Sequence, residues 1–401
     1  MAVHPSLISK WKLLFALLII ININTGCWDS QKIEDLTFSI GAGFDLVTEE
    51  NGDQSAASPP YKLKVTYQNL IPTQTRGSSS AGASTPSESY HNITAIGDSI
   101  HELTRRVSLL TKPVSGEHVK VIVIGRKLAE RIEMETLLNL FFRDEEFRES
   151  CLIFIAREDA ARTLSSSKID IPSYLIKSIS DNQYRSTKIL PTFTLQKAIS
   201  KLQSNSSFIL QTIDVQEGNI VFSGGGIIDG NTHLLTNFFS PKHAQGLAWI
   251  TGHKQGGLLT IRNKNNQTQF IYEISRIKSK MNAIVQGDKI SFHIHIQSTG
   301  RISEDWRNLK VDPKHAIQLV RQSEGQIISE AKTYIQDTIN EMQKTKADVA
   351  DFSTTLRIQH PHVWNKVKRD WNRVFSTIPI TYDIAIQIED YGLENMGLSQ
   401  D

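Results

Sequence analysis

The chain has 401 residues, 39% of them hydrophobic and 21% charged, with only two cysteines. This is the composition of a globular protein, and the length predicts two or three domains. There are 44 basic and 42 acidic residues, and removal of residues 1–26, which contain Lys10 and Lys12, would leave 42 of each. Nucleic-acid-binding surfaces need concentrated positive charge, so we expect no nucleic acid among the partners.

The amino terminus has the pattern of a secretory signal peptide. Lys10 and Lys12 form a basic flank, and nine unbroken apolar residues, Leu13–Ile21, follow. That run fits the apolar region of a signal peptide, whereas a membrane-spanning helix needs about 20 residues.

A lipid attachment site is expected directly after this run, where Gly26 precedes Cys27. In bacterial lipoproteins the cysteine sulfur accepts a diacylglyceryl group, with acyl chains such as palmitate, and a peptidase then cuts before the cysteine. Cleavage between Gly26 and Cys27 would remove residues 1–26. Two acyl chains, at about 0.8 kcal/mol per buried methylene, anchor a protein stably. Asn24 stands where a leucine is usual, so the alternative is an ordinary signal peptide or an uncleaved anchor.

The next region, residues 27–203, is predicted to be an α/β domain. Phe38–Leu46 and Tyr61–Tyr67 alternate apolar and polar residues, as two strands would. The low-complexity segment Gly77–Ser89 is expected to be a mobile loop. Apolar residues at helical spacing predict a helix over Ile96–Leu110.

Two nearly continuous apolar runs follow, at His118–Gly125 and Leu152–Ala156, with a helical pattern over Leu128–Phe142 between them. Apolar strands joined by a helical crossover predict a parallel pair that is covered on both faces. Cys151 adjoins the second run, and we expect it to be a small buried hydrophobic residue. A further helix is expected over Asp170–Ile179, where Pro172 suits the first turn.

The remaining chain is expected to form a β-rich middle domain, residues 204–265, and a C-terminal α+β domain, residues 266–401, that contains a long helix over 313–346. The fold class is therefore α+β, with three domains, each with a mostly antiparallel or mixed sheet packed by helices. The expected strands are Phe208–Val215, Asn219–Ile228, His233–Phe238, Leu258–Asn263, Gln269–Ile277, Met281–Gln286, Ile290–Gln297 and Ile378–Ile388.

Candidate chemical sites are few. Gly224-Gly225-Gly226 lacks the Lys-Ser/Thr of a phosphate-binding loop and is expected to form a bulge or tight turn. His293 and His295 would share one strand face, and such a pair can bind zinc only if a further ligand comes from elsewhere. We expect a solvent-facing polar pair instead.

Two further clusters receive equally simple interpretations. His360-Pro361-His362 is expected to be a turn before a helix, and Asp144-Glu145-Glu146 a turn with local ion pairing. Acid–base catalysis by paired carboxylates needs opposed environments, which these residues do not indicate. We therefore expect no catalytic residue, no cofactor, no metal site and no enzymatic activity.

Several segments, taken together in their order and spacing, resemble the Ger(x)C family, the lipoprotein C subunits of spore nutrient-germinant receptors. The similarity runs from Cys27 to about Tyr391. The segments are Gly26-Cys-Trp-Asp29, Ile33-Glu-Asp-Leu36, Gly41-Ala-Gly-Phe-Asp45, His118–Ile124, Phe141-Phe-Arg-Asp-Glu-Glu-Phe-Arg148, Asp348-Val-Ala-Asp-Phe352, Pro361-His-Val-Trp364 and Trp371-Asn-Arg-Val-Phe375.

This resemblance implies three α+β domains on the outer face of the inner spore membrane. It implies assembly with two integral membrane subunits, of the A and B types, into a complex that senses nutrients and triggers germination. The family is not known as an enzyme, and the only functional residue carried over is Cys27, as the lipid attachment site.

Two other functions remain open at this point. A lipid-anchored solute-binding protein of a transporter would have two similar lobes around a cleft, and the sequence lacks a clear βαβα alternation through both halves. An anchored hydrolase would need a nucleophile, metal or carboxylate site, and none rises above background.

Overall fold

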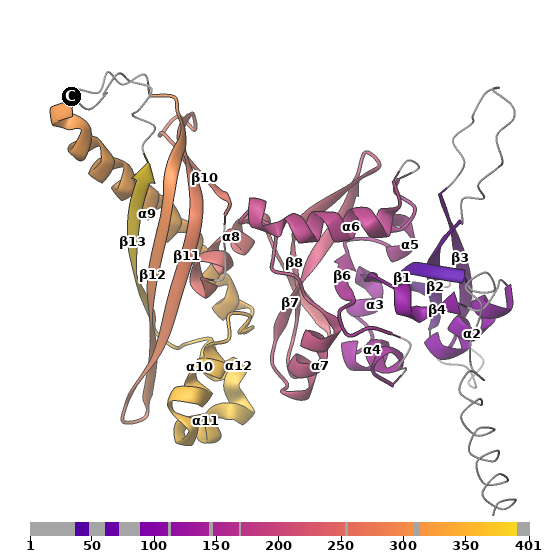
Figure 1. The fold of residues 1–401 in the computed structure, drawn as a ribbon. Coiled ribbons are helices and arrows are strands. Elements are labelled where there is room, and N and C mark those ends of the chain that lie inside the picture. The colour runs from indigo at the N-terminus through magenta and orange to yellow at the C-terminus, as the bar shows by residue number, and fades with distance from the viewer. Residues whose placement is uncertain are drawn as a thin grey trace, which may run out of the picture.

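The computed structural model describes residues 37–47, 61–71, 89–110, 114–143, 147–167, 170–252, 256–307 and 313–390. Within these residues the chain forms two β-sheets that follow one another along the molecule, each packed by helices (Figure 1). The expected α+β class is confirmed.

The first sheet is mixed. Its strand order is β3-β2-β1-β5-β6-β7-β8-β9, and the short β4 pairs with β1 outside this path. The central strands β1, β5, β6 and β7 are parallel, whereas the pairs at both ends of the sheet are antiparallel. The strands are β1 (Thr37–Val47), β2 (Lys62–Leu70), β3 (Tyr90–Gly97), β4 (Val114–Ser115), β5 (Val121–Gly125), β6 (Leu152–Ala156), β7 (Phe208–Gln216), β8 (Asn219–Ile228) and β9 (Leu235–Phe239).

Helices cover both faces of this sheet, because its central strands are apolar on both sides. Ile122 and Ile124 of β5 belong to the core formed with α2, α4 and α7, whereas Val121 and Val123 belong to the core formed with α5 and α6. The helices are α2 (Ile100–Leu110), α3 (Arg126–Ala129), α4 (Met134–Arg143), α5 (Ala160–Thr163), α6 (Pro172–Asp181) and α7 (Leu195–Gln203), with 3-10 turns at Gly116–His118 and Asn182–Arg185.

The parallel pairing of β5 with β6 confirms the crossover predicted from the two apolar runs. Val121 pairs with Leu152, and Gly125 pairs with Ala156. Cys151, just before β6, is 2% exposed, as expected of a small buried hydrophobic residue.

The prediction of one helix over Ile96–Leu110 is wrong at its start. Ile96 belongs to the edge strand β3, and α2 begins only at Ile100. Most of β3 is polar or partly exposed, so it lacks the strong apolar alternation by which a strand is recognised.

The second sheet has the order β10-β11-β12-β13. Its first three strands are antiparallel, and β13 lies parallel to β12. Helix α9 confirms the long helix expected over 313–346. The elements are α8 (Pro241–Thr251), β10 (Leu258–Arg262), β11 (Thr268–Gln286), β12 (Lys289–Asp305), α9 (Pro313–Lys344), α10 (Phe352–Gln359), α11 (Pro361–Val367), the 3-10 turn Lys368–Asp370, α12 (Trp371–Phe375) and β13 (Ile380–Asp390).

Two predicted strands, Gln269–Ile277 and Met281–Gln286, are wrong as separate elements, because β11 runs unbroken through both. Its register against β12 shifts near Tyr272 and Arg276, and such irregularities locally bend and twist a strand without ending it.

The strands predicted for the middle region, residues 204–265, belong to the two sheets already described and do not form a third sheet. β7, β8 and β9 extend the first sheet, and β10 belongs to the second. The division into 27–203, 204–265 and 266–401 therefore stays a prediction about domains, within an architecture of two sheets.

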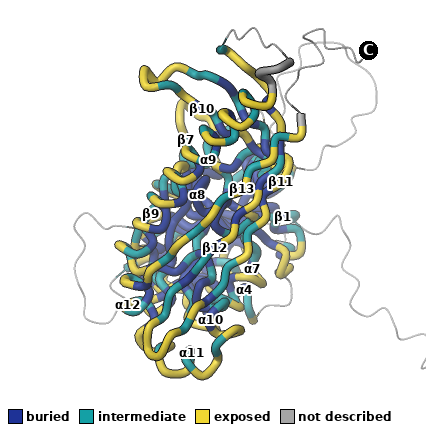
Figure 2. Tube along the Cα trace, turned by 90° about the vertical axis from the view of Figure 1, so that its left-hand side faces the viewer, coloured by how far each residue is buried: buried dark blue, intermediate teal, exposed yellow. Residues whose placement is uncertain are grey.

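Helix α8 lies between the two sheets (Figure 1). Its buried Trp249 shares one core with Phe239 of β9 and with Phe292 and Ile294 of β12. Figure 2 looks at the second sheet and shows exposed and more buried residues in alternation along β12 and β13. That alternation gives the second sheet one face against the core and one face toward solvent.

Candidate functional site

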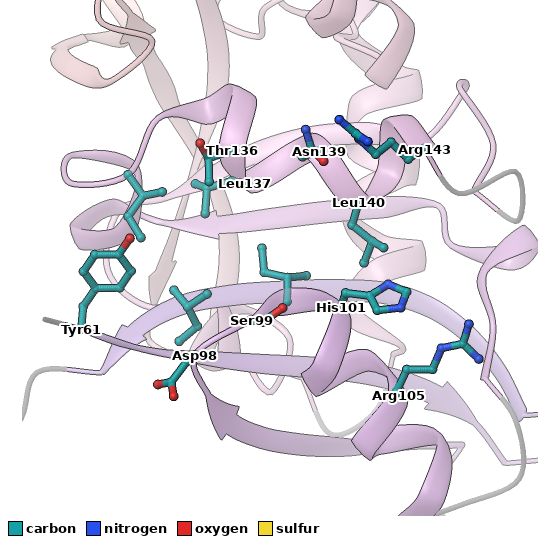
Figure 3. A pocket seen from close by; sticks show the side chains of 13 residues that line it. Tyr61, Asp98, Ser99, His101, Arg105, Thr136, Leu137, Asn139, Leu140 and Arg143 are labelled. Carbon is teal, nitrogen blue, oxygen red and sulfur yellow. The ribbon is translucent and has the colours of Figure 1, made fainter. Parts of the chain in front are cut away.

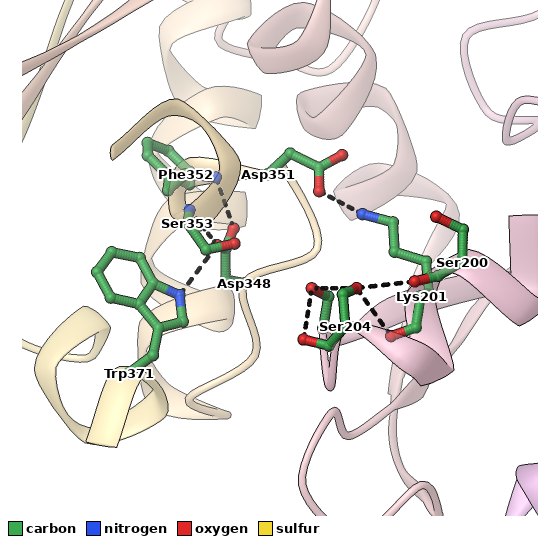
Figure 4. Close-up of polar contacts among 9 residues, drawn as sticks. Ser200, Lys201, Ser204, Asp348, Asp351, Phe352, Ser353 and Trp371 are labelled. Atoms are coloured by element: carbon green, nitrogen blue, oxygen red, sulfur yellow. Dashed lines mark hydrogen bonds and ion pairs between the residues drawn. The ribbon is translucent and has the colours of Figure 1, made fainter. Parts of the chain in front are cut away.

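A cleft opens where the carboxy-terminal helices α10 to α12 approach α7. Its volume is about 800 Å³, and its lining includes Lys201 of α7, Arg357 of α10 and Asn372 of α12. We call it the junction cleft, because its walls come from the helices packed on the two different sheets (Figure 4).

The wall of the junction cleft is organised by one buried carboxylate, Asp348, which is 3% exposed. Its two oxygens accept hydrogen bonds from the backbone N–H groups of Phe352 (3.0 Å) and Ser353 (2.7 Å) at the start of α10, and from the indole Nε1 of Trp371 (3.1 Å) at the start of α12. Burial raises the pKa of Asp348, against the lowering effect of the bonds from Ser353 and Phe352. One side chain thus fixes α10 relative to α12.

Two polar contacts then connect this wall to the helices and turns of the first sheet. Asp351, which begins α10, forms an ion pair with Lys201 of α7, and Asn372 Nδ2 donates to Asp229 Oδ2 at 2.9 Å. Asp348 and Asp351, the two carboxylates of the segment Asp348–Phe352, therefore both hold parts of the chain together.

The motif Gly41-Ala-Gly-Phe-Asp45 of β1 is explained by close packing and by helix capping. A Cβ on Gly41 would lie 2.0 Å from Ser173 Oγ, and one on Gly43 would lie 3.0 Å from Leu164 Cδ1. Asp45 accepts hydrogen bonds from the N–H groups of Ala160 (2.6 Å) and Ala161 (2.9 Å). Asp45 thereby caps the N-terminus of α5 from a neighbouring strand, and burial raises its pKa.

A second cavity lies between α2 and α4, with a volume of about 650 Å³. Figure 3 shows Arg105, Arg143 and His101 toward one end and Tyr61 and Asp98 toward the other. The lining also includes the apolar side chains of Leu63, Ile100, Ile132, Leu137 and Leu140. Its size falls within the range of small-molecule sites, which are about 300–1,000 Å³.

The histidine pair of β12 does share one face, and it has a neighbour that the sequence did not reveal. Asp383 of β13 places Oδ1 at 2.7 Å from His293 Nε2 and at 2.6 Å from His295 Nδ1. Partial burial acts to raise the pKa of Asp383, but hydrogen bonds and positive charge from the two histidines outweigh it and lower that pKa. This is the one group of three potential metal ligands within the described part of the chain.

The other sequence candidates have plain structural roles. Gly224 has a φ of +92° and lies where the register between β7 and β8 shifts, so the expected bulge is confirmed. His360 lies between α10 and α11, with Nε2 at 3.2 Å from the carbonyl oxygen of Ala283, as a residue in a turn before a helix. Burial raises the pKa of the Cys151 thiol to about 12, which removes its nucleophilic form at neutral pH.

Gly26, Cys27, residues 77–88 of the low-complexity loop and the cluster Asp144–Glu146 lie outside the described residues. Within the described ranges, no helix has both the length and the hydropathy required to cross a bilayer.

Sequence reasoning missed two residues that complete these arrangements, Lys201 and Asp383. Asp383 occupies a polar position of an alternating strand, which indicates an outward-facing side chain. Its proximity to His293 follows only from the parallel pairing of β12 with β13, and no local pattern indicates that pairing.

Two family models match consecutive parts of the chain. The model described as the spore germination protein N-terminal domain matches residues 29–215, and the model described as "spore germination B3/GerAC like, C-terminal" matches residues 223–392.

Individual proteins of Bacillus subtilis (strain 168) are similar over nearly the whole length. Spore germination protein YndF is 33% identical, with 92% of this chain and 93% of that protein covered. Spore germination protein B3 is 29% identical, with 96% and 98% covered. Among solved structures, the crystal structure of the GerBC protein superposes with a TM-score of 0.59 at 26% identity, and the match covers 86% of this chain and 97% of that one.

Proposed function

The chain belongs to the spore germination B3/GerAC-like family, also called Ger(x)C, and has a role in spore germination; on that premise we propose that it is the lipid-anchored, non-enzymatic ectodomain subunit of a nutrient-germinant receptor complex. The observation that carries this proposal is that the family similarity begins at residue 29, two residues after Cys27, and continues to residue 392. The two matches, residues 29–215 and 223–392, together span most of the expected mature chain.

The anchor is proposed from the amino-terminal sequence. Diacylglyceryl-Cys27, exposed by cleavage after Gly26, would hold the ectodomain on the extracytoplasmic face of the inner spore membrane. Such tethering raises the effective concentration of the ectodomain for membrane partners without any added contact. The proposed partners are two integral membrane subunits of the A and B types.

The junction cleft supports an ectodomain that acts as one connected body. Its carboxylates join α7 to α10 and α10 to α12, and α8 shares a core with both sheets. A load or displacement applied to one sheet by a membrane subunit would therefore reach the other through packed elements.

Replacing Cys27 by alanine tests the proposal. In spores that carry Cys27→Ala as their only copy, we expect the protein to leave the membrane fraction and the response to nutrients to be lost or strongly delayed. A matched Cys151→Ala strain should keep both properties, because Cys151 is buried away from the surface. Membrane retention and normal germination in the Cys27→Ala strain would refute the tethering.

Partner assignment needs a separate experiment. The wild-type protein is purified from spore membranes in mild detergent, and the co-purifying proteins are identified by mass spectrometry. Recovery of A- and B-type membrane subunits is expected. Recovery of transporter components, together with nutrient binding by the purified chain in calorimetry, would favour the solute-binding alternative; the two sheets, however, differ in strand order and are not similar lobes.

A further inference from the structure

We propose that His293, His295 and Asp383 form a binding site for a divalent transition-metal ion of the zinc class, on the solvent-facing side of the second sheet. This departs from the expectation of no metal site. The sequence offered two ligands, and the third lies 90 residues beyond His293. The proposal is independent of the receptor function.

The two strands present the three side chains on one face. His293 and His295 are two residues apart on β12, and Asp383 of β13 is in register with His295. The neighbouring Tyr382 points the other way, because its hydroxyl donates to the carbonyl oxygen of Lys332 in α9 at 3.4 Å. Successive strand residues alternate faces, so Asp383 lies on the side away from α9.

The ligand atoms already converge. Asp383 Oδ1 is within 2.7 Å of a nitrogen of each histidine, and the three candidate ligand atoms lie within 4.8 Å of one another. Bonds of about 2.0–2.2 Å from nitrogen and oxygen to zinc require the ligand atoms to move slightly apart. The side chains are 27%, 50% and 56% exposed, for His293, His295 and Asp383 respectively, so they have room for that movement.

The Thr381 hydroxyl is an outer hydrogen-bond partner of His293. The Thr381 hydroxyl donates its single proton to the carbonyl oxygen of Phe292 at 3.3 Å. It therefore accepts from His293 Nδ1–H, which is 2.7 Å away. Nε2, on the other side of the ring, lies 2.7 Å from Asp383 Oδ1. Without an ion a proton on Nε2 bridges these two atoms, and a bound ion would replace that proton. An outer partner on the second ring nitrogen is typical of metal-bound histidines.

The types of ligand atom indicate which ion would bind. Two imidazole nitrogens and one carboxylate oxygen suit zinc and its neighbours, whereas magnesium and calcium prefer oxygen ligands alone. Three protein ligands leave a fourth position open to water. Lys280 of β11 is in register with His295 and brings positive charge to this face, so we expect weaker binding than at a closed four-ligand site.

A bound ion would clamp β13 to β12. Among the described strands β13 pairs with β12 alone, so its position depends on that single ladder and on α9. Cross-linking His293 and His295 to Asp383 would stabilise this last strand.

The test uses the untagged full chain in detergent, freed of metal by chelation, and titrated with Co²⁺ and with Zn²⁺. We expect one equivalent of Co²⁺ to give the strong visible absorption of tetrahedral coordination, and Zn²⁺ to displace it. Asp383→Asn and His293→Ala should abolish the spectrum. Thr381→Val should weaken binding by about tenfold or more, the usual effect of removing an outer hydrogen-bond partner.

His362→Ala is the matched control, since His362 is an exposed histidine outside the group, and it should bind as the wild type does. Circular dichroism of each variant establishes that it is folded. The proposal is overturned if the folded wild-type chain shows no tetrahedral Co²⁺ spectrum, or if Asp383→Asn binds the ion as tightly as the wild type. In the second outcome the ion sits elsewhere; in the first, a proton on His293 alone bridges the group.

Discussion

Asp348 accepts a hydrogen bond from the indole nitrogen of Trp371 at 3.1 Å, although 23 residues separate the two in the chain. Both residues belong to the carboxy-terminal segments on which the family resemblance rests. Their contact gives these segments a structural role, because the carboxylate holds the first turns of α10 and α12 in one arrangement beside the junction cleft.

Replacing Asp348 by alanine should lower the free energy of unfolding by about 3 kcal/mol or more. The change leaves the N–H groups of Phe352 and Ser353 and the indole of Trp371 buried without an acceptor, and each unsatisfied donor costs about 1–3 kcal/mol. Urea denaturation measures the loss. Asp351→Asn, three residues away, is the control; its partly exposed ion pair with Lys201 should contribute less than about 1 kcal/mol. Equal losses in the two variants would contradict this account.

The stability of the chain should depend on pH through Asp348. Burial raises its native-state pKa above the ordinary 3.8, so the native state holds this proton more tightly than the unfolded state does. The resulting stabilisation is complete below the ordinary pKa and is lost as the pH rises through the native-state pKa. Asp348→Asn cannot ionise, so the wild-type advantage over this variant should be largest in acid and shrink as the pH rises. Denaturation series at several pH values measure it, and an advantage that grows with pH would refute the direction.

Gly41→Ala should destabilise the protein by about 1–3 kcal/mol, because the new methyl group would meet Ser173 Oγ at 2.0 Å inside the core. The Ser173 hydroxyl is buried with no hydrogen-bond partner among the described residues. Ser173→Ala should therefore cost little alone, and it should offset part of the Gly41→Ala loss in the double variant.

Gly325→Ala in α9 is the contrasting variant. A Cβ at Gly325 would meet nothing within 4 Å, so the change should stabilise the protein by about 0.5–1 kcal/mol. Thermal unfolding of the four variants checks both signs, and strict additivity at 41 and 173 would contradict the contact.

Cys151 should resist alkylation in the native protein at neutral pH. The side chain is 2% exposed, and burial raises the pKa of its thiol to about 12, so the reactive thiolate is scarce and inaccessible. Iodoacetamide followed by mass spectrometry should find Cys151 unmodified in buffer and modified in denaturant. Rapid labelling of the folded chain would show that β6 opens far more readily than its packing indicates.

Local patterns were sufficient for the elements whose burial repeats with a fixed period. The apolar run Leu152–Ala156 coincides with β6, and the long apolar stripe from residue 313 coincides with α9. Helix α8 was not predicted from the sequence, because its residues Ala244–Ile250 are all buried. A helix that is surrounded has no polar face, and it therefore lacks the amphipathic period that marks a surface helix.

The sequence by itself determined the proposed lipid site, the α+β class, most strands and the resemblance to a family, because each of these depends on residues adjacent in the chain or on segment order. Only the tertiary structure decided that the middle strands join two sheets, that Lys201 meets Asp351, and that Asp383 meets the histidine pair. Strand pairing and helix packing bring together residues far apart in sequence, and a residue's own neighbours carry no information about its distant partner.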